Sequence, residues 1–131
     1  MDERWPLILV VEDSPTQAKQ FASILSPYKV RVVIANDGLQ GLRLIHSQLP
    51  DMIILDVNMP KMDGYQMCLR LKRDSTTAHI PVVMLTSLVT AEATLRGLEV
   101  GANDFIAKDT LSRENLLATV NAYLKVVENG K

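Results

Sequence analysis

Carboxylates directly follow two of the apolar segments in this sequence. Glu12 and Asp13 come after the segment 7–11, and Asp56 comes after the segment 52–55. Two carboxylates about 4 Å apart repel by roughly 4 kcal/mol at an effective dielectric constant near 20, so three of them together require a proton or a cation. Oxygen ligands with room for water are the environment that Mg²⁺ prefers. If these side chains converge, the sequence predicts a magnesium site.

A hydroxyl and an ammonium group complete this set. Thr86 follows the apolar segment 82–85, and Lys108 follows the segment 105–107. A carboxylate held against a dication can attack a phosphoryl group, because such catalysis is mostly positioning and charge neutralisation. Lys108 would bring a positive charge to the phosphate and Thr86 a hydroxyl donor. We therefore interpret Asp56 as a phosphate acceptor.

The expected metal ligands differ in how they would reach the ion. Asp13 and Asp56 are expected to bind Mg²⁺ directly, whereas Glu12 is one methylene longer than an aspartate and would act through a metal-bound water. The backbone carbonyl of Asn58 would add a neutral ligand, and the side chain of Asn58 need not contribute. The remaining positions would be left to water and phosphate oxygens.

The elements that must position these residues follow from periodicity. Apolar runs typical of strands buried on both faces occupy residues 7–11, 30–35, 52–55, 82–85 and 105–107. The stretches that follow each run carry apolar residues at helical spacing, which predicts five amphipathic helices. Ser14 and Pro15 form a cap and first turn where the first helix should begin, and Gly101 stands where the fourth should end.

Alternating strands and helices predict an α/β fold with a parallel sheet covered by helices on both faces, a three-layer sandwich. The nearest arrangement is the doubly wound, flavodoxin-like (βα)5 order 2-1-3-4-5, in which ligands bind beyond the carboxyl ends of the strands. The polar residues described above follow strands one, three, four and five, so they should meet at this crevice. Their convergence is the main argument for a site.

Composition limits the other possibilities. The 131 residues are 47% apolar with a net charge of −1, which predicts one domain with a core over about 7–126 and a tail over 127–131. Balanced charge gives no indication of direct nucleic-acid binding. Without a long apolar run or a signal-peptide core, we expect no membrane association and a cytoplasmic location. A single cysteine, Cys68, and two histidines argue against a disulfide or a zinc site.

These motifs resemble those of the receiver domains of two-component response regulators, which have a CheY-like fold. The resemblance covers nearly the whole chain, from Leu7 to about Val126. Four segments carry it: the acidic pair in 11–14, the run 55–64 around Asp56, the threonine segment 85–87, and 101–108 with its aromatic and lysine positions.

The resemblance implies that Asp56 accepts a phosphoryl group from a phosphohistidine on a sensor histidine kinase or a histidine phosphotransfer protein. The acyl phosphate would later hydrolyse, so the domain would assist its own phosphorylation and dephosphorylation without being a turnover enzyme. The resemblance also implies that Thr86 moves toward the phosphate and that Phe105, at the aromatic switch position, rotates inward. The face formed by the fourth helix, fifth strand and fifth helix would then change its protein partners, and homodimer formation stays open.

The sequence departs from the family pattern after the lysine, where Asp109 replaces the usual proline. A cis peptide before a residue other than proline costs about 3–4 kcal/mol, so we expect a trans Lys108–Asp109 bond. The charge of Asp109 is expected to lower phosphorylation or to hasten phosphate loss. Leu88, two residues beyond Thr86, is apolar where water would approach, which predicts a slower decay.

Ordinary structural roles compete with these interpretations. Residues 12–15 could serve only as a helix cap, Phe105 as core packing and Lys108 as a solvated lysine. A nucleotide-binding module would need a glycine-rich turn after the first strand. An aspartate-nucleophile phosphatase would need a second carboxylate where Asn58 stands. The alternative that remains is a receiver-like module that binds proteins without phosphorylation.

Overall fold

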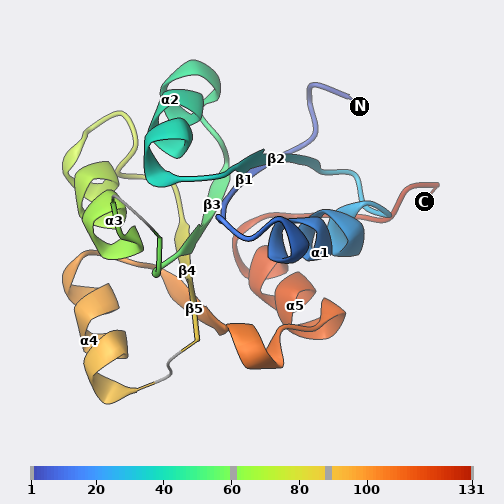
Figure 1. The fold of residues 1–131 in the computed structure, drawn as a ribbon. Helices are drawn as coiled ribbons and strands as arrows, with labels where there is room; N and C mark the ends of the chain where they lie inside the picture. Colours follow the sequence, from blue (N-terminus) through green and yellow to red (C-terminus); the bar gives the residue numbers. More distant parts are fainter. Residues whose placement is uncertain (1, 60–61, 88–89, 131) are drawn as a thin grey trace.

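Five strands alternate with five α-helices along the chain (Figure 1). The structure is a computed structural model that describes residues 2–59, 62–87 and 90–130. The strands are β1 (Leu7–Val11), β2 (Arg31–Ala35), β3 (Met52–Asp56), β4 (Val82–Thr86) and β5 (Asp104–Ala107). The helices are α1 (Pro15–Leu25), α2 (Gly38–Gln48), α3 (Gly64–Arg73), α4 (Ala91–Glu99) and α5 (Arg113–Tyr123), with a 3₁₀ turn η1 (Lys108–Thr110) before α5.

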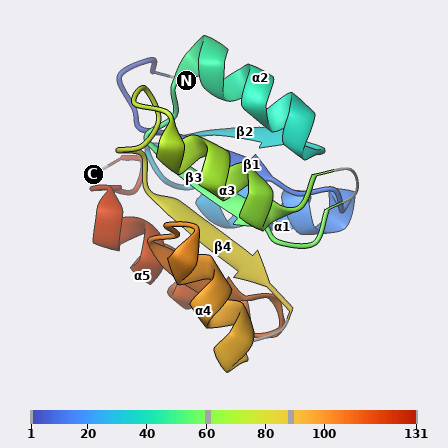
Figure 2. The ribbon, with the colours of Figure 1, turned by 90° about the vertical axis from the view of Figure 1, so that its left-hand side faces the viewer.

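All five strands pair in parallel, in the order β2-β1-β3-β4-β5. Helices α1 and α5 cover one face of this sheet, and α2, α3 and α4 cover the other (Figures 1 and 2). The predicted three-layer architecture and strand order are confirmed. The carboxyl ends of β1, β3, β4 and β5 therefore lie along one edge of the sheet, where the sequence places its polar residues.

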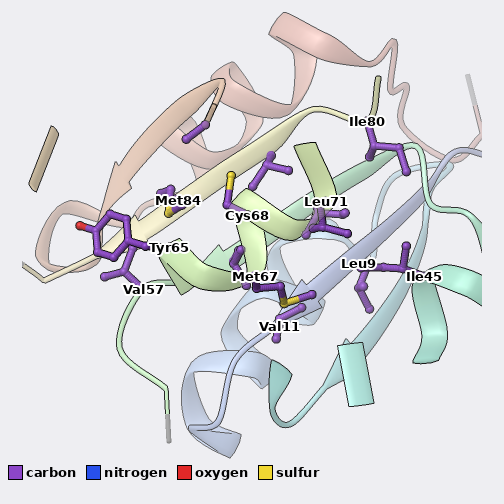
Figure 3. Close-up of a cluster of buried hydrophobic side chains, with 14 of the residues drawn as sticks. Leu9, Val11, Ile45, Val57, Tyr65, Met67, Cys68, Leu71, Ile80 and Met84 are labelled. Carbon is purple, nitrogen blue, oxygen red and sulfur yellow. The ribbon is translucent and has the colours of Figure 1, made fainter. Parts of the chain in front are cut away.

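Each strand contributes side chains to two separate cores, because successive residues point to opposite faces. In β1, Leu9 and Val11 belong to the cluster beneath α2 and α3, whereas Ile8 and Val10 belong to the cluster beneath α1 and α5. Figure 3 shows the first of these clusters, with the buried side chain of Met67 from α3 lying against the sheet. With both faces covered, functional groups are left to the loops at the strand ends.

Every α-helix begins with a side chain that caps its first turn. In each case a serine, threonine or aspartate oxygen accepts a hydrogen bond from the backbone N–H three residues later. The five caps are Ser14, Asp37, Asp63, Thr90 and Ser112. A capping residue of this type typically stabilises a helix by about 1 kcal/mol. Because each helix follows a parallel strand, the capped ends lie at the same edge of the sheet as the predicted site.

None of the helices in the described part of the chain has the length and apolar character needed to span a membrane.

Leu49 has a positive φ of 29° at the end of α2, and it is 53% exposed. Left-handed backbone conformations cost residues other than glycine about 1–2 kcal/mol, whereas glycine itself loses about 0.5–1 kcal/mol through its flexibility in the unfolded chain. We expect Leu49→Gly to be more stable than Leu49→Ala by about 0.5–1 kcal/mol, as measured by urea unfolding. The alanine variant is the matched control, because it removes the same exposed side chain without relieving the backbone. Equal stabilities would contradict a strained position.

Candidate phosphoryl-acceptor site

Asp56 ends β3 with a side chain that is completely buried. One carboxylate oxygen, Oδ2, accepts a hydrogen bond from Lys108 Nζ at 2.9 Å. The other, Oδ1, accepts a hydrogen bond from the backbone N–H of Asn58 at 2.9 Å. Both oxygens are thus held in place by partners from different segments, which fixes the orientation of the carboxylate.

Lys108 reaches this carboxylate from the end of β5. Its Nζ also lies 3.7 Å from Glu12 Oε2, so one ammonium group is shared between two carboxylates. The Lys108–Asp109 peptide is trans, as predicted, since the described backbone contains no cis bond. Asp109 itself lies exposed in η1.

Glu12 and Asp13 bring two more carboxylates to Asp56. One carboxylate oxygen from each of the three residues lies within 4.8 Å of the others. Glu12 is only 1% exposed, and its Oε1 accepts a hydrogen bond from the backbone N–H of Ser14 at 3.1 Å. Its Oε2 has no hydrogen-bond partner among the described residues. An orphaned buried oxygen in an all-oxygen cluster fits a hard divalent cation.

The balance of charge also favours a cation. The Lys108 ammonium group contacts two of the three carboxylates, those of Glu12 and Asp56. Burial of Glu12, followed by its close contact with the Asp56 carboxyl, raises the pKa of Glu12 from 4.5 to about 7. The bond from Ser14 and the charge of Lys108 oppose this rise. Glu12 therefore needs either a proton or a metal ion near neutral pH.

Thr86 is the last residue of β4 and is 4% exposed. Leu85 pairs with Asp56 in the sheet, so Thr86 lies one position beyond the acceptor on the neighbouring strand. Thr86 and Asn58 line a cavity of about 280 Å³ that extends to the first turns of α4. The sequence prediction that Thr86 lies at the crevice agrees with this position. Asn58 is positioned by its N–H and by its side-chain amide, which donates to Ser87 Oγ at 3.5 Å. A metal-ligand role for its carbonyl oxygen stays a prediction.

Phe105 is half-buried in β5, and its ring packs against Gly97 of α4. A Cβ atom at position 97 would collide with the edge of the ring, so the glycine is what allows this contact. Gly97 is also the one buried residue of α4 over its range Ala91–Glu99. The contact places Phe105 beneath α4, while its predicted rotation stays a prediction. Leu88, expected to shield the site from water, lies outside the described residues.

Gly64 has a positional role that was not predicted from the sequence. A Cβ atom there would collide with the carbonyl oxygen of Asp56 and would lie 2.8 Å from the Cα of Val57. The backbone N–H of Gly64 donates to the Val57 carbonyl at 3.1 Å. Asp63 caps α3 and forms a reciprocal capping box with Gln66. Helix α3 therefore starts directly against the backbone of Asp56.

The family model for the response regulator receiver domain matches residues 8–121. The chain belongs to this family. The receiver domain is 38% identical over 120 residues to the DNA-binding dual master transcriptional regulator RpaA of Synechocystis, covering 92% of this chain and 49% of RpaA. The chain covers 45% of another relative, the probable transcriptional regulator ycf27 of Guillardia theta. It thus spans about half the length of these curated relatives.

Two solved structures share the fold of this receiver domain. The chemotaxis protein CheY4 of Vibrio cholerae superposes with a TM-score of 0.86 at 30% identity, over 92% of this chain and 99% of CheY4. The receiver domain of the sensor histidine kinase PA1611 of Pseudomonas aeruginosa has a TM-score of 0.82 at 27% identity, over 91% and 97% of the two chains. That structure has a magnesium ion coordinated in its active site cleft.

Protons should compete with a divalent ion at Glu12. The pKa of about 7 means that the carboxyl is mostly protonated at pH 6 and mostly ionised at pH 8. Because the Glu12 carboxylate would hold a metal-bound water only when it is deprotonated, the apparent Mg²⁺ affinity should rise by up to about tenfold from pH 6 to pH 8. Calorimetric titrations of the wild-type protein across this range measure it. In the Glu12→Gln variant the side chain at position 12 cannot titrate, so the Mg²⁺ affinity should depend less on pH. An equally steep pH dependence would show that another group is responsible.

Proposed function

We propose that this receiver domain accepts a phosphoryl group on Asp56 in a Mg²⁺-dependent reaction and thereby changes its protein contacts. The donor would be a phosphohistidine of a cytoplasmic sensor histidine kinase or histidine phosphotransfer protein. The observation that carries the proposal is the buried Asp56 carboxylate, which lies 2.9 Å from the Lys108 ammonium and within 4.8 Å of two further carboxylates. Membership of the receiver family supports it.

The acidic cluster would hold the metal ion through Asp13 and Asp56, with Glu12 acting through water and the Asn58 carbonyl as a neutral ligand. The magnesium ion in the PA1611 receiver domain supports this assignment. When bound, Mg²⁺ neutralises negative charge on the phosphoryl oxygens and on the attacking carboxylate.

The transfer itself requires little chemistry from the protein beyond position and charge. An Asp56 oxygen forms the new O–P bond as the P–N bond of the phosphohistidine breaks, and the electron pair of that bond returns to the imidazole nitrogen. Lys108 already contacts the acceptor carboxylate, so its ammonium group can follow the charge onto the phosphate. Thr86 supplies a hydroxyl from the neighbouring strand. Asn58 stands where a phosphatase would need an acid, which favours a non-turnover acceptor.

The output would pass through the face formed by α4, β5 and α5. Leu95 and Leu98 of α4 are each 58% exposed, and such apolar side chains on one helix suit a protein partner or a second copy of the chain. Phe105 lies beneath this helix against Gly97, so a rotation of its ring would alter how α4 packs. Conversion of a local charge change into an altered surface is the general logic of such switches.

Phosphorylation of Asp56 is directly measurable. Incubated with Mg²⁺ and acetyl phosphate, the wild-type protein should gain one phosphoryl group by intact mass spectrometry, and EDTA should prevent the gain. Asp56→Ala should gain none. Asp51→Asn is a matched control, because Asp51 precedes the other end of the same strand, where its side chain accepts a hydrogen bond from the N–H of Leu7. It should be phosphorylated like the wild type.

A wild-type protein that stays unmodified, or an Asp56→Ala variant that is still modified, would contradict the proposal. The first outcome would favour the alternative of a receiver-like module that binds proteins without phosphorylation.

The charge of Asp109 should shorten the lifetime of the phosphorylated state. Asp109 directly follows the lysine that would pair with the phosphate, so its negative charge would repel the negative phosphoryl group. We expect Asp109→Asn to lengthen the half-life of phosphorylated Asp56 by about two- to fivefold, because a partly screened surface charge contributes less than about 1 kcal/mol. Mass spectrometry after removal of the donor measures the decay. Glu99→Gln, which removes a charge at the far end of α4, should leave the half-life unchanged.

A further inference from the structure

The last part of the chain, residues 124–130, is attached to the turn between α1 and β2. We call this segment the C-terminal strap. The N–H of Lys29 donates to the carbonyl of Val127 at 2.7 Å, and the N–H of Asn129 donates to the carbonyl of Pro27 at 2.8 Å. Tyr28 and Glu128 form the antiparallel bridge between these two hydrogen bonds. The strap therefore docks through its backbone beside the α1–β2 turn (Figure 1).

One guanidinium group connects this docked strap to helix α5. Arg113 Nη2 donates to the phenol oxygen of Tyr28 at 2.8 Å, and its guanidinium lies 5.8 Å from the centre of the Tyr28 ring. Arg113 Nη2 also lies 3.8 Å from Glu128 Oε1. Tyr28 is only 8% exposed, so it presents a fixed surface to the arginine. The first turn of α5, the strap that follows this helix and the remote α1–β2 turn therefore meet at Arg113.

Arg113 is also close to the acceptor site along the chain. It is the first residue of α5, and only residues 109–112 separate it from Lys108, whose ammonium group contacts Asp56. This connection is tightly hydrogen-bonded. The Asn115 side chain donates to the Thr110 carbonyl, and the Ser112 hydroxyl accepts from the Asn115 N–H at 3.1 Å. A shift of η1 would therefore be transmitted to the first turn of α5.

The contacts of Arg113 with the strap are weak and can readily break. The side chains of Arg113 and Glu128 are 56% and 41% exposed, and ion pairs between such exposed groups are weak. The strap buries only one apolar side chain deeply, that of Val126 at 8% exposure. Segments with few buried contacts open more readily than the core of a protein. A small displacement of Arg113 can thus change how much of the time the strap is docked.

We propose that the C-terminal strap is a second output region of the acceptor site, meaning that its contacts change when Asp56 is phosphorylated. Arg113 would transmit this change to the strap, and we call Arg113 the joint. This inference rests on the proposed function. When Asp56 becomes an acyl phosphate, Lys108 follows the new negative charge, η1 and the first turn of α5 shift, and the contacts of Arg113 with Tyr28 and Glu128 weaken. The strap is then released from the α1–β2 turn. This output lies on the side of the sheet covered by α1 and α5, away from the exposed face of α4.

Linkage makes the relation reciprocal for binding equilibria. If phosphate at Asp56 favours the released strap, then loss of the Arg113 contacts favours the arrangement of η1 that accommodates phosphate. Arg113 acts through Lys108 here and is a positioning residue, since it does not contact Asp56.

Amide hydrogen exchange of Lys29 and Asn129 tests the proposal, because these two N–H groups donate across the strap interface. Exchange is measured by NMR before and after treatment of the full chain with Mg²⁺ and acetyl phosphate, with the phosphoryl group on Asp56 verified by mass spectrometry. We expect both amides to exchange about tenfold faster in the phosphorylated protein. The amides of β1 serve as an internal reference for global unfolding and should not change.

Two variants test whether Arg113 is the residue that keeps the strap docked. Arg113→Gln should exchange rapidly at Lys29 and Asn129 without phosphate, and phosphorylation should add little. Lys125→Gln is the matched control, because it removes an exposed cation from the strap itself. It should keep slow exchange and the full response to phosphorylation.

The proposal is overturned if Asp56 carries phosphate while both amides exchange as before, or if Arg113→Gln leaves their exchange unchanged. A wild-type protein that gains no phosphate would refute the proposed function instead. In that case Lys108→Met tests the joint without phosphate, because it removes the contact with Asp56 that holds η1. Faster exchange at Lys29 and Asn129 would support the joint, and unchanged exchange would refute it.

Discussion

The proposed acceptor site is built on an imbalance of charge that the fold itself creates. Both faces of the sheet are covered by helices, so the strand ends form the place where Glu12, Asp13 and Asp56 can gather. Lys108 is the cation that the described residues bring to them. One ammonium group does not neutralise the buried pair Glu12 and Asp56 together with the exposed Asp13 beside them, so the cluster favours additional positive charge.

The surrounding elements act mainly by limiting how this cluster can relax. Helix α3 starts directly against the backbone of Asp56 because Gly64 has no side chain, and the N–H of Asn58 holds one oxygen of the acceptor. Lys108 holds the other oxygen from a 3₁₀ turn that leads into α5. The acceptor carboxylate is thus held on one side by the close contact of α3. On the other side lies α4, which is the shortest of the α-helices and has one buried residue.

The order of elements and the main residues of the site could be predicted from the sequence, because both depend on local patterns. The apolar runs predicted the bounds of each strand to within one residue. The parallel topology then brings Asp56 and Glu12 to one edge of the sheet. Other features depend on how distant segments dock. Nothing in the local pattern indicates that Gly64 touches the backbone of Asp56, or that Arg113 joins Tyr28. Leu49 adopts a positive φ that its residue type disfavours, so tertiary structure overrides the local preference there.

The strand order also determines when the charges of the site come together during synthesis. Glu12, Asp13 and Asp56 all belong to the first half of the chain, and β1 pairs directly with β3. The ammonium of Lys108 follows β5, an edge strand that pairs only with β4 in the described sheet. As the chain leaves the ribosome from its N-terminus, the carboxylates are available long before the lysine that partly neutralises them. Until Lys108 has been synthesised, the repulsion among these carboxylates is reduced only by protons and by cations from the surrounding solution.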